Sequence, residues 1–356
     1  MKQFLMVTII VFIAANVFAV DKYWISIGGD NSEIGPTGKS TPIFLLQIDE
    51  NGTVTKAPQI VVPVSQLSKD SDNEKPTAMS YDAHGNILLF YGQDRDNDVH
   101  VATIDKNNLS LISLRRVLTG LTDLNWLQVT QPFGDVLASE NPDGIMRGFR
   151  MNLDGIYTNS KFRLSPRSDA KGGNMKASIA PDGGMSAVFA HLQNVKDKDP
   201  IYLQPLRPDD RLPLGTPAVI LNNGGSLDID ISNLLPNGTR IVVYDDDAAE
   251  ETYFLQVVNG STGQKIGQRK LLTSRISGEV DGQMAVDPKG RFAIFNVNGD
   301  DAGCDNDGKQ PLFFQKLNPS TGDPVGSAFA ITSCNLYSTD SSNSQSQFGI
   351  DILQVQ

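Results

Sequence analysis

The sequence predicts an all-β fold, a six-bladed β-propeller whose ring closes by pairing the N- and C-terminal strands in one blade. A repeated pattern of short strands and a half-repeat at each end support this prediction. The clearest copy spans residues 78–105, with an alternating strand at 78–81, a turn at 82–85, an apolar run at 86–91 and another alternating strand at 99–104. Three strands alone cannot bury their faces, so recurrence decides the fold.

A glycine in the first turn marks each copy of the repeat. The copies cover residues 78–105, 127–153, 177–206, 227–258 and 283–317. Their turn glycines are Gly85, Gly134, Gly183, Gly238 and Gly290, at spacings of 49, 49, 55 and 52 residues. Periods near 50 residues with short strands are typical of propeller blades, because each twisted sheet buries its faces against its neighbours.

The remaining blade is expected to combine both ends of the chain. Residues 348–352 match the first strand of a repeat, whereas 23–27 and 42–49 match a second and a third strand. Pairing the two ends closes the ring and covers strand edges that would otherwise promote aggregation. A two-sheet β-sandwich would not explain such complementary half-repeats. We therefore predict a single propeller domain over residues 20–356.

The same segments resemble the WD40-like (PD40-type) repeats of TolB-type six-bladed propellers. The resemblance lies in Ala-Pro-Asp-Gly at 180–183, Asp-Pro-Lys-Gly at 287–290 and GQDRDNDVHV at 92–101. It covers most of the chain after residue 20 and implies a partner segment that enters the central channel. The chain departs from TolB itself, which has an α/β domain before its propeller, because the first strand here follows almost directly on the leader. The architecture hosts scaffolds, binding proteins and enzymes alike.

Residues 1–19 have the pattern of a secretory signal peptide. Lys2 gives a positive start, residues 4–15 an apolar core, and Val17-Phe18-Ala19 a cleavage site. The apolar run is shorter than the ~20 residues that a transmembrane helix needs. We therefore expect cleavage after Ala19, no later membrane span, and a secreted or periplasmic protein.

Acidic residues dominate the charge of the chain. Asp and Glu number 41 against 30 Lys and Arg, a net charge of −11. Nucleic acids and anionic membranes need a basic surface, so neither is the expected partner. The expected partner is a protein or peptide with a basic surface, bound by a monomer.

The two cysteines, Cys304 and Cys334, are expected to form a disulfide, because exported proteins meet an oxidising environment. Cys304 lies in a predicted loop between second and third strands, and Cys334 in a loop to the next blade; both kinds of loop open on one face. Such a bridge would contribute roughly 3 kcal/mol. Two free thiols are the alternative.

The second-to-third strand loops are predicted to form an acidic face. Proposed binding residues on it are Asp94, Arg95, Asp96, Asp98, Asp197 and Asp199. Two acidic clusters are candidate Ca²⁺ sites, since carboxylate oxygens suit this ion. They are Asp300, Asp301, Asp305 and Asp307, and Asp245, Asp246 and Asp247. The first departs from an EF-hand loop, and solubilising loop acids are the alternative for both.

No catalytic signature stands out. The chain has no G-x-S-x-G, P-loop, H-E-x-x-H or Rossmann pattern, and its three histidines are dispersed. The channel is expected to be lined by mostly small or apolar residues around Met79, Ser80, Ile179, Ile229 and Ala285. A non-catalytic binding or scaffold role is therefore the leading hypothesis. A metal-dependent lactonase- or sugar-acid-lyase-like enzyme is the alternative, since acidic loops supply carboxylates that could hold a metal at the channel mouth.

Overall fold

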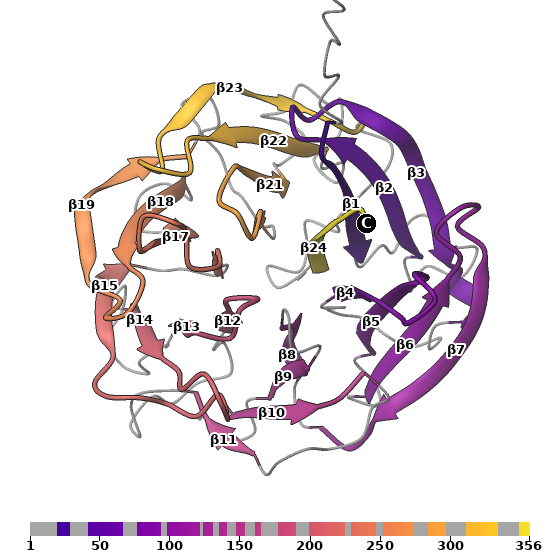
Figure 1. Cartoon of the computed structure of the whole chain (residues 1–356), viewed down its shortest axis with the longest axis horizontal. Coiled ribbons are helices and arrows are strands. Elements are labelled where there is room, and N and C mark those ends of the chain that lie inside the picture. The colour runs from indigo at the N-terminus through magenta and orange to yellow at the C-terminus, as the bar shows by residue number, and fades with distance from the viewer. Residues whose placement is uncertain are drawn as a thin grey trace, which may run out of the picture.

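A computed structural model shows six four-stranded antiparallel sheets arranged in a ring, which confirms the predicted fold (Figure 1). It describes residues 20–28, 42–66, 77–93, 98–121, 124–130, 135–140, 147–153, 161–164, 177–189, 199–224, 229–246, 252–272, 284–296, 311–333 and 349–356. The leader, Cys304 and Cys334 lie outside these residues. In the described part, no helix is long and apolar enough to cross a membrane.

Blade 1 is built from both ends of the chain, as the half-repeats predicted. Its strands run in the order β24 (Gly349–Gln354), β1 (Lys22–Gly28), β2 (Ile43–Asp49) and β3 (Val54–Val62), and a short 3-10 helix (Val64–Gln66) follows β3. Six residues of β24 pair with β1, from Gly349 opposite Gly28 to Gln354 opposite Tyr23. This pairing closes the ring.

The other blades follow in chain order. Blade 2 comprises β4 (Thr77–Tyr81), β5 (Ile87–Gln93), β6 (Asp98–Ile104) and β7 (Leu111–Leu118), and blade 3 comprises β8 (Leu124–Val129), β9 (Val136–Glu140), β10 (Arg147–Met151) and β11 (Phe162–Arg163). Blade 4 comprises β12 (Ala177–Ile179), β13 (Met185–Phe189), β14 (Asp199–Pro205) and β15 (Ala218–Gly224). Blade 5 comprises β16 (Ile229–Ile231), β17 (Thr239–Asp246), β18 (Thr252–Asn259) and β19 (Lys265–Leu271), and blade 6 comprises β20 (Met284–Val286), β21 (Phe292–Asn296), β22 (Leu312–Leu317) and β23 (Pro324–Ala330).

The first-to-second strand turns show why the glycine recurs. In blade 2 the Asp82 carboxylate accepts hydrogen bonds from the backbone amides of His84 and Asn86, both at 2.8 Å. Gly85 then adopts a φ of 77°, a left-handed conformation that glycine reaches without a Cβ penalty. Gly183, Gly238 and Gly290 are also left-handed, with φ values of 65°, 79° and 66°. The turn glycine is thus a conformational requirement of the repeat.

Each interface between neighbouring blades contains its own apolar cluster. Between blades 1 and 2, Trp24 packs with Leu45, Leu89 and Tyr91. Between blades 1 and 6, Tyr23, Phe292 and Phe314 pack with Ile352 of the closing strand. The Trp24 side chain is only 2% exposed and is therefore part of this core. The core is therefore divided among the blade interfaces.

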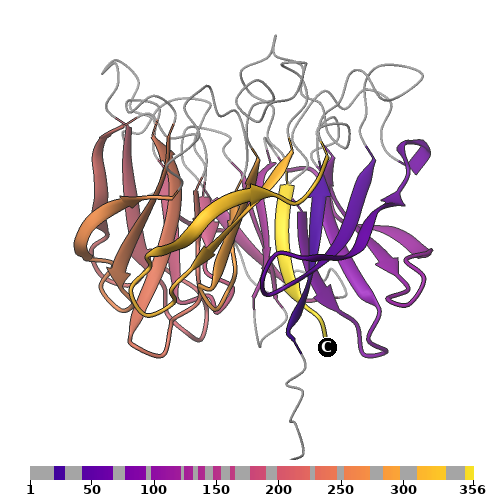
Figure 2. The ribbon, with the colours of Figure 1, turned by 90° about the horizontal axis from the view of Figure 1, so that it is seen from above.

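The first strand of every blade faces the centre of the ring (Figure 1). The first-to-second strand turns lie on one face, called the turn face here, and the second strands end on the opposite face, called the loop face. The C-terminus lies on the turn face (Figure 2). Sites at the centre of either face can therefore draw on residues from all blades.

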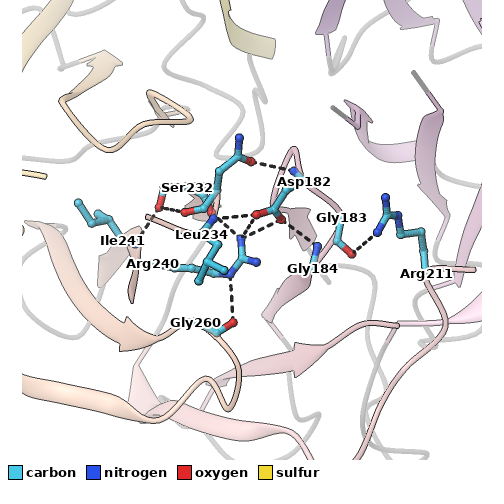
Figure 3. A network of polar contacts seen from close by, with 10 residues as sticks. Asp182, Gly183, Gly184, Arg211, Ser232, Leu234, Arg240, Ile241 and Gly260 are labelled. Atoms are coloured by element: carbon cyan, nitrogen blue, oxygen red, sulfur yellow. Dashed lines mark hydrogen bonds and ion pairs between the residues drawn. The ribbon is translucent and has the colours of Figure 1, made fainter. Parts of the chain in front are cut away.

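Buried charge also joins blades 4 and 5 near the turn face (Figure 3). Arg240 of β17 donates to both carboxylate oxygens of Asp182, at 2.9 and 2.8 Å, and the Arg240 side chain is only 4% exposed. Asp182 also accepts the backbone amides of Gly184 and Leu234. A buried arginine is tolerated here because its charge and several of its donors are matched.

Candidate binding site at the channel mouth

A cavity of about 290 Å³ opens at the turn-face end of the ring centre, and we call it the channel mouth. Its wall draws on all six blades. It consists of Met79, Tyr81, Gln128, Val129, Pro181, Asn233, Asp287, Pro288, Lys289 and residues 351–356. A site shared by every blade is held in shape by ring closure.

Inner strands and their following turns place these side chains. Met79 and Tyr81 come from β4, Gln128 from β8, and Asn233 from the turn after β16. The Tyr81 hydroxyl donates to the Gln354 carbonyl at 3.2 Å, which ties blade 2 to the closing strand. Asn233 accepts the amide of Asp182 at 2.7 Å, so the Arg240 network also supports the wall.

Asp351 of β24 also lines the wall, and its carboxylate contacts a backbone amide. Among the described residues, no cation pairs with it. Its Oδ2 accepts the backbone amide of Met79 in the neighbouring blade at 2.6 Å. Burial raises the pKa of Asp351 to about 7, and the negative charge of Asp230 adds to this shift. The side chain therefore titrates near neutral pH.

Asp230 of β16 makes a similar contact between blades but is more fully engaged. One oxygen accepts the Ser178 hydroxyl of blade 4 at 2.6 Å, and the other accepts the Val286 amide of blade 6 at 2.7 Å. Burial raises the pKa of Asp230 to about 6. Asp230 joins three blades and is not among the residues that line the channel mouth.

The other acid of the wall is neutralised. Asp287 accepts from Arg291 Nε at 2.8 Å, and Arg291 also reaches Asp21 at 2.8 Å. The carboxylates of Asp287 and Asp21 raise the pKa of Arg291 despite the opposing effect of burial. Lys289, an exposed residue at the rim, adds one positive charge.

Three acids assigned to the acidic loop face lie instead in strands, with buried side chains. Asp98 begins β6, accepts from Arg116 at 3.0 Å and from the Gly120 amide at 3.0 Å, and is 2% exposed. Asp245 and Asp246 end β17, and Asp246 pairs with Arg269 of β19. The prediction that these three residues lie in exposed loops is therefore wrong, and for Asp98 and Asp246 an arginine of the outer strand of the same blade allows the burial. Asp199 likewise lies in β14 rather than in a loop.

The remaining predicted site residues lie outside the described residues. They are Asp94, Arg95, Asp96, Asp197, Asp247, Asp300, Asp301, Asp305, Asp307, Cys304 and Cys334. The disulfide, the Ca²⁺ sites and the acidic binding face thus stay predictions. Within the described part of the chain, no group of three His, Cys, Asp or Glu is placed to hold a metal ion.

The predicted lining of the channel needs a correction as well. Met79 lines the mouth. Ile179, Ile229 and Ala285 pack in the clusters between blades and are not among the residues that line the mouth. Sequence reasoning missed Asp230 and Asp351. The available signal was an aspartate flanked by isoleucines, Ile-Asp-Ile, at 229–231 and again at 350–352.

No protein-family model and no curated protein matches the chain. Solved propellers are similar in fold. TolB from Acinetobacter baumannii is 12% identical with a TM-score of 0.51, over 86% of this chain and 65% of that one. A protein provisionally assigned as TolB from Agrobacterium tumefaciens is 10% identical with a TM-score of 0.50, over 95% and 100% of the two chains.

A protein provisionally assigned as a 6-phosphogluconolactonase from Bacteroides uniformis is 14% identical, with a TM-score of 0.47 over 86% of this chain and 81% of that one. At such identities the comparisons show a propeller fold shared with TolB-like proteins. The WD40-like repeat type stays a prediction from the sequence.

Proposed function

We propose that this protein is an exported, non-catalytic binding propeller that holds an extended protein or peptide segment at its channel mouth. The observation that carries the proposal is the cavity of about 290 Å³ whose wall combines residues of all six blades. Ligand sites typically combine apolar walls with a few fixed polar groups. Met79, Ile352 and Leu353 supply apolar surface here, and Gln128, Asn233 and Asp351 supply polar groups.

The ring makes this wall rigid. Asp351 binds the amide of Met79, and the Tyr81 hydroxyl binds the Gln354 carbonyl, so two blades hold one side of the mouth. A site that is formed before binding loses little conformational entropy when the ligand enters. Export is supported by the leader pattern of residues 1–19.

The enzymatic alternative receives no specific support from the described residues. A metal-dependent propeller enzyme needs several ligands that converge on one ion. The carboxylates of the channel mouth are engaged differently, because Asp287 pairs with Arg291 and Asp351 accepts a backbone amide. The candidate Ca²⁺ loops lie outside the described residues, and binding is therefore the function that the channel mouth favours.

A larger side chain placed in the channel mouth tests the proposal. The full chain is screened against an immobilised array of random decapeptides, and the strongest hits are titrated against Gln128→Trp. Gln128 is partly exposed and lines the cavity, so an indole there should weaken binding at least about tenfold, or about 1.4 kcal/mol.

Lys265→Trp, on the exposed outer strand β19, is the matched control and should bind like the wild type. Circular dichroism checks that both variants fold. A wild type that binds no peptide of the array, or hits that bind Gln128→Trp unchanged, would overturn the proposal.

A further inference from the structure

We infer that the channel mouth selects a positively charged group of the bound segment, a lysine side chain or an α-amino group, through the carboxylate of Asp351. This inference rests on the proposed function and adds the chemical class of the ligand.

The acids near the ring centre differ in how they are balanced. Asp287 is paired with Arg291, and Asp230 is engaged at both oxygens by Ser178 and Val286. Asp351 accepts the amides of Met79 and Ile352, and no ion pair with a described lysine or arginine accompanies them. Removing a carboxylate from water is costly, and neutral donors alone do not balance its negative charge. A bound cation would offset this desolvation cost.

The wall suits a long cationic side chain better than a compact ion. Asp351 lies in the same cavity as Met79, Ile352 and Leu353, which offer apolar surface for a methylene stem. Lysine places its stem along such surface while its ammonium meets a carboxylate. Gln128 and Gln354 supply further amide groups for the ammonium or for the peptide backbone.

The sign of the charge follows from the same residues. An anionic ligand would meet the carboxylate of Asp351, whose pKa is raised by burial and, to a smaller extent, by the negative charge of the nearby Asp230. Lys289 has the opposite sign but is exposed at the rim, where solvent screens its charge. Removing that charge by Lys289→Gln should therefore strengthen the binding of a cation by a small factor.

The test compares two acetylated and amidated heptapeptides of alanine and serine, one with a central lysine and one with a central methionine. Methionine has an unbranched apolar side chain one atom shorter than that of lysine and carries no charge. Titration of the full chain by NMR should show about tenfold tighter binding of the lysine peptide, the usual scale for one partly desolvated charged contact. Asp351→Asn should abolish this preference.

Asp230→Asn is the matched control, because Asp230 is also an inner-strand aspartate but does not line the mouth. It should keep the preference for lysine. Binding of the lysine peptide should also strengthen about tenfold from pH 6 to pH 8 as Asp351 ionises. The groups that face Asp351 are the amides of Met79 and Ile352 and the Asp230 carboxylate.

Equal binding of the two heptapeptides, or a preference for lysine that survives in Asp351→Asn, would overturn the inference. If array peptides bind at the mouth with no requirement for a positive charge, the inference fails and the proposed function stands. If no peptide binds at all, both fail. The two results are therefore distinguishable.

Discussion

Ion pairs of similar length contribute unequally to the stability of the fold. Arg240 is nearly buried and donates to Asp182 and to the carbonyl oxygens of Ser232 and Gly260. Arg207 makes an ion pair of similar length with Asp210, but both of these side chains are largely exposed, at 46% and 40%. Burial distinguishes these pairs, because solvent screens the exposed one and the loss of a buried partner leaves a charge uncompensated.

Replacing Arg240 should therefore destabilise the protein far more than replacing Arg207. We expect Arg240→Met to lower the free energy of unfolding by about 3 kcal/mol, because it leaves Asp182 without its cation. Arg207→Met should cost less than about 1 kcal/mol. Urea denaturation followed by tryptophan fluorescence measures the free energy of unfolding of both variants. Equal losses would show that the buried pair of Arg240 with Asp182 contributes no more than the exposed pair.

Buried acids were the residues hardest to place from sequence. Asp98, Asp245 and Asp246 stand where apolar strand patterns meet polar ones, a pattern that predicts a loop at each position. Their burial depends on partners distant along the chain, such as Arg116 for Asp98 and Arg269 for Asp246. Periodicity reports which face of a strand is apolar, but it does not report where a distant arginine will lie.

Among the elements, inner and outer strands differ in how clearly the sequence marks them. Inner and second strands are buried and apolar, as in β4 and β21, and the repeat reveals them. The outer strand β19 is exposed along nearly its whole length and carries little apolar alternation. Large exposed apolar residues are concentrated on such outer strands, for example Ile266, Val325 and Phe329. The blade count was therefore predictable, whereas the outer-strand bounds were not.

The inner strands β16 and β24 should make stability depend on pH. Burial raises the folded-state pKa of Asp230 to about 6 and of Asp351 to about 7, against ~3.9 in an unfolded chain. The folded state therefore holds these protons more tightly, and the cost of burying the ionised groups is present in full above about pH 8. Lowering the pH to about 5 should relieve that cost and stabilise the fold by up to about 4 kcal/mol, most of it from Asp351.

Urea unfolding at pH 8 and pH 5 measures this effect. Asp230 faces Ser178 and the amides of Ile231 and Val286, and Asp351 faces Asp230, so the two acids are the titrating groups of this cluster. The double variant Asp230→Asn, Asp351→Asn should show a smaller gain between the two pH values than the wild type. If the wild type and the double variant both lost the same amount of stability between pH 8 and pH 5, Asp230 and Asp351 would not be the groups that cause the pH effect.

For the whole molecule, the two chain ends were the most informative part of the sequence. Each end is incomplete as a repeat, and only a ring lets residues 23–27 and 348–352 complete each other. The structure confirms this closure through the pairing of β24 with β1. The channel mouth was less predictable, because it combines residues of all blades whose positions depend on the closed ring.

Removal of the closing strand should therefore affect the whole ring. A chain that ends at residue 348 lacks Ile350 and Ile352, which pack in the cluster between blades 1 and 6, and Leu353, which packs between blades 1 and 2. Burial of such a side chain contributes about 2 kcal/mol, so the loss is a large part of the 5–15 kcal/mol typical of a domain. We expect a marked fall in melting temperature and self-association through the exposed edge of β1.

A chain that ends at Gln354 is the matched control, since it keeps all of β24 and removes only two residues after the strand. It should melt close to the wild type. A synthetic peptide of residues 347–356, added in excess to the shorter chain, should restore the melting temperature and the monomer, because binding to the folded state shifts the unfolding equilibrium. A shorter chain that melts like the wild type without the peptide would show that blades 2–6 are stable without closure.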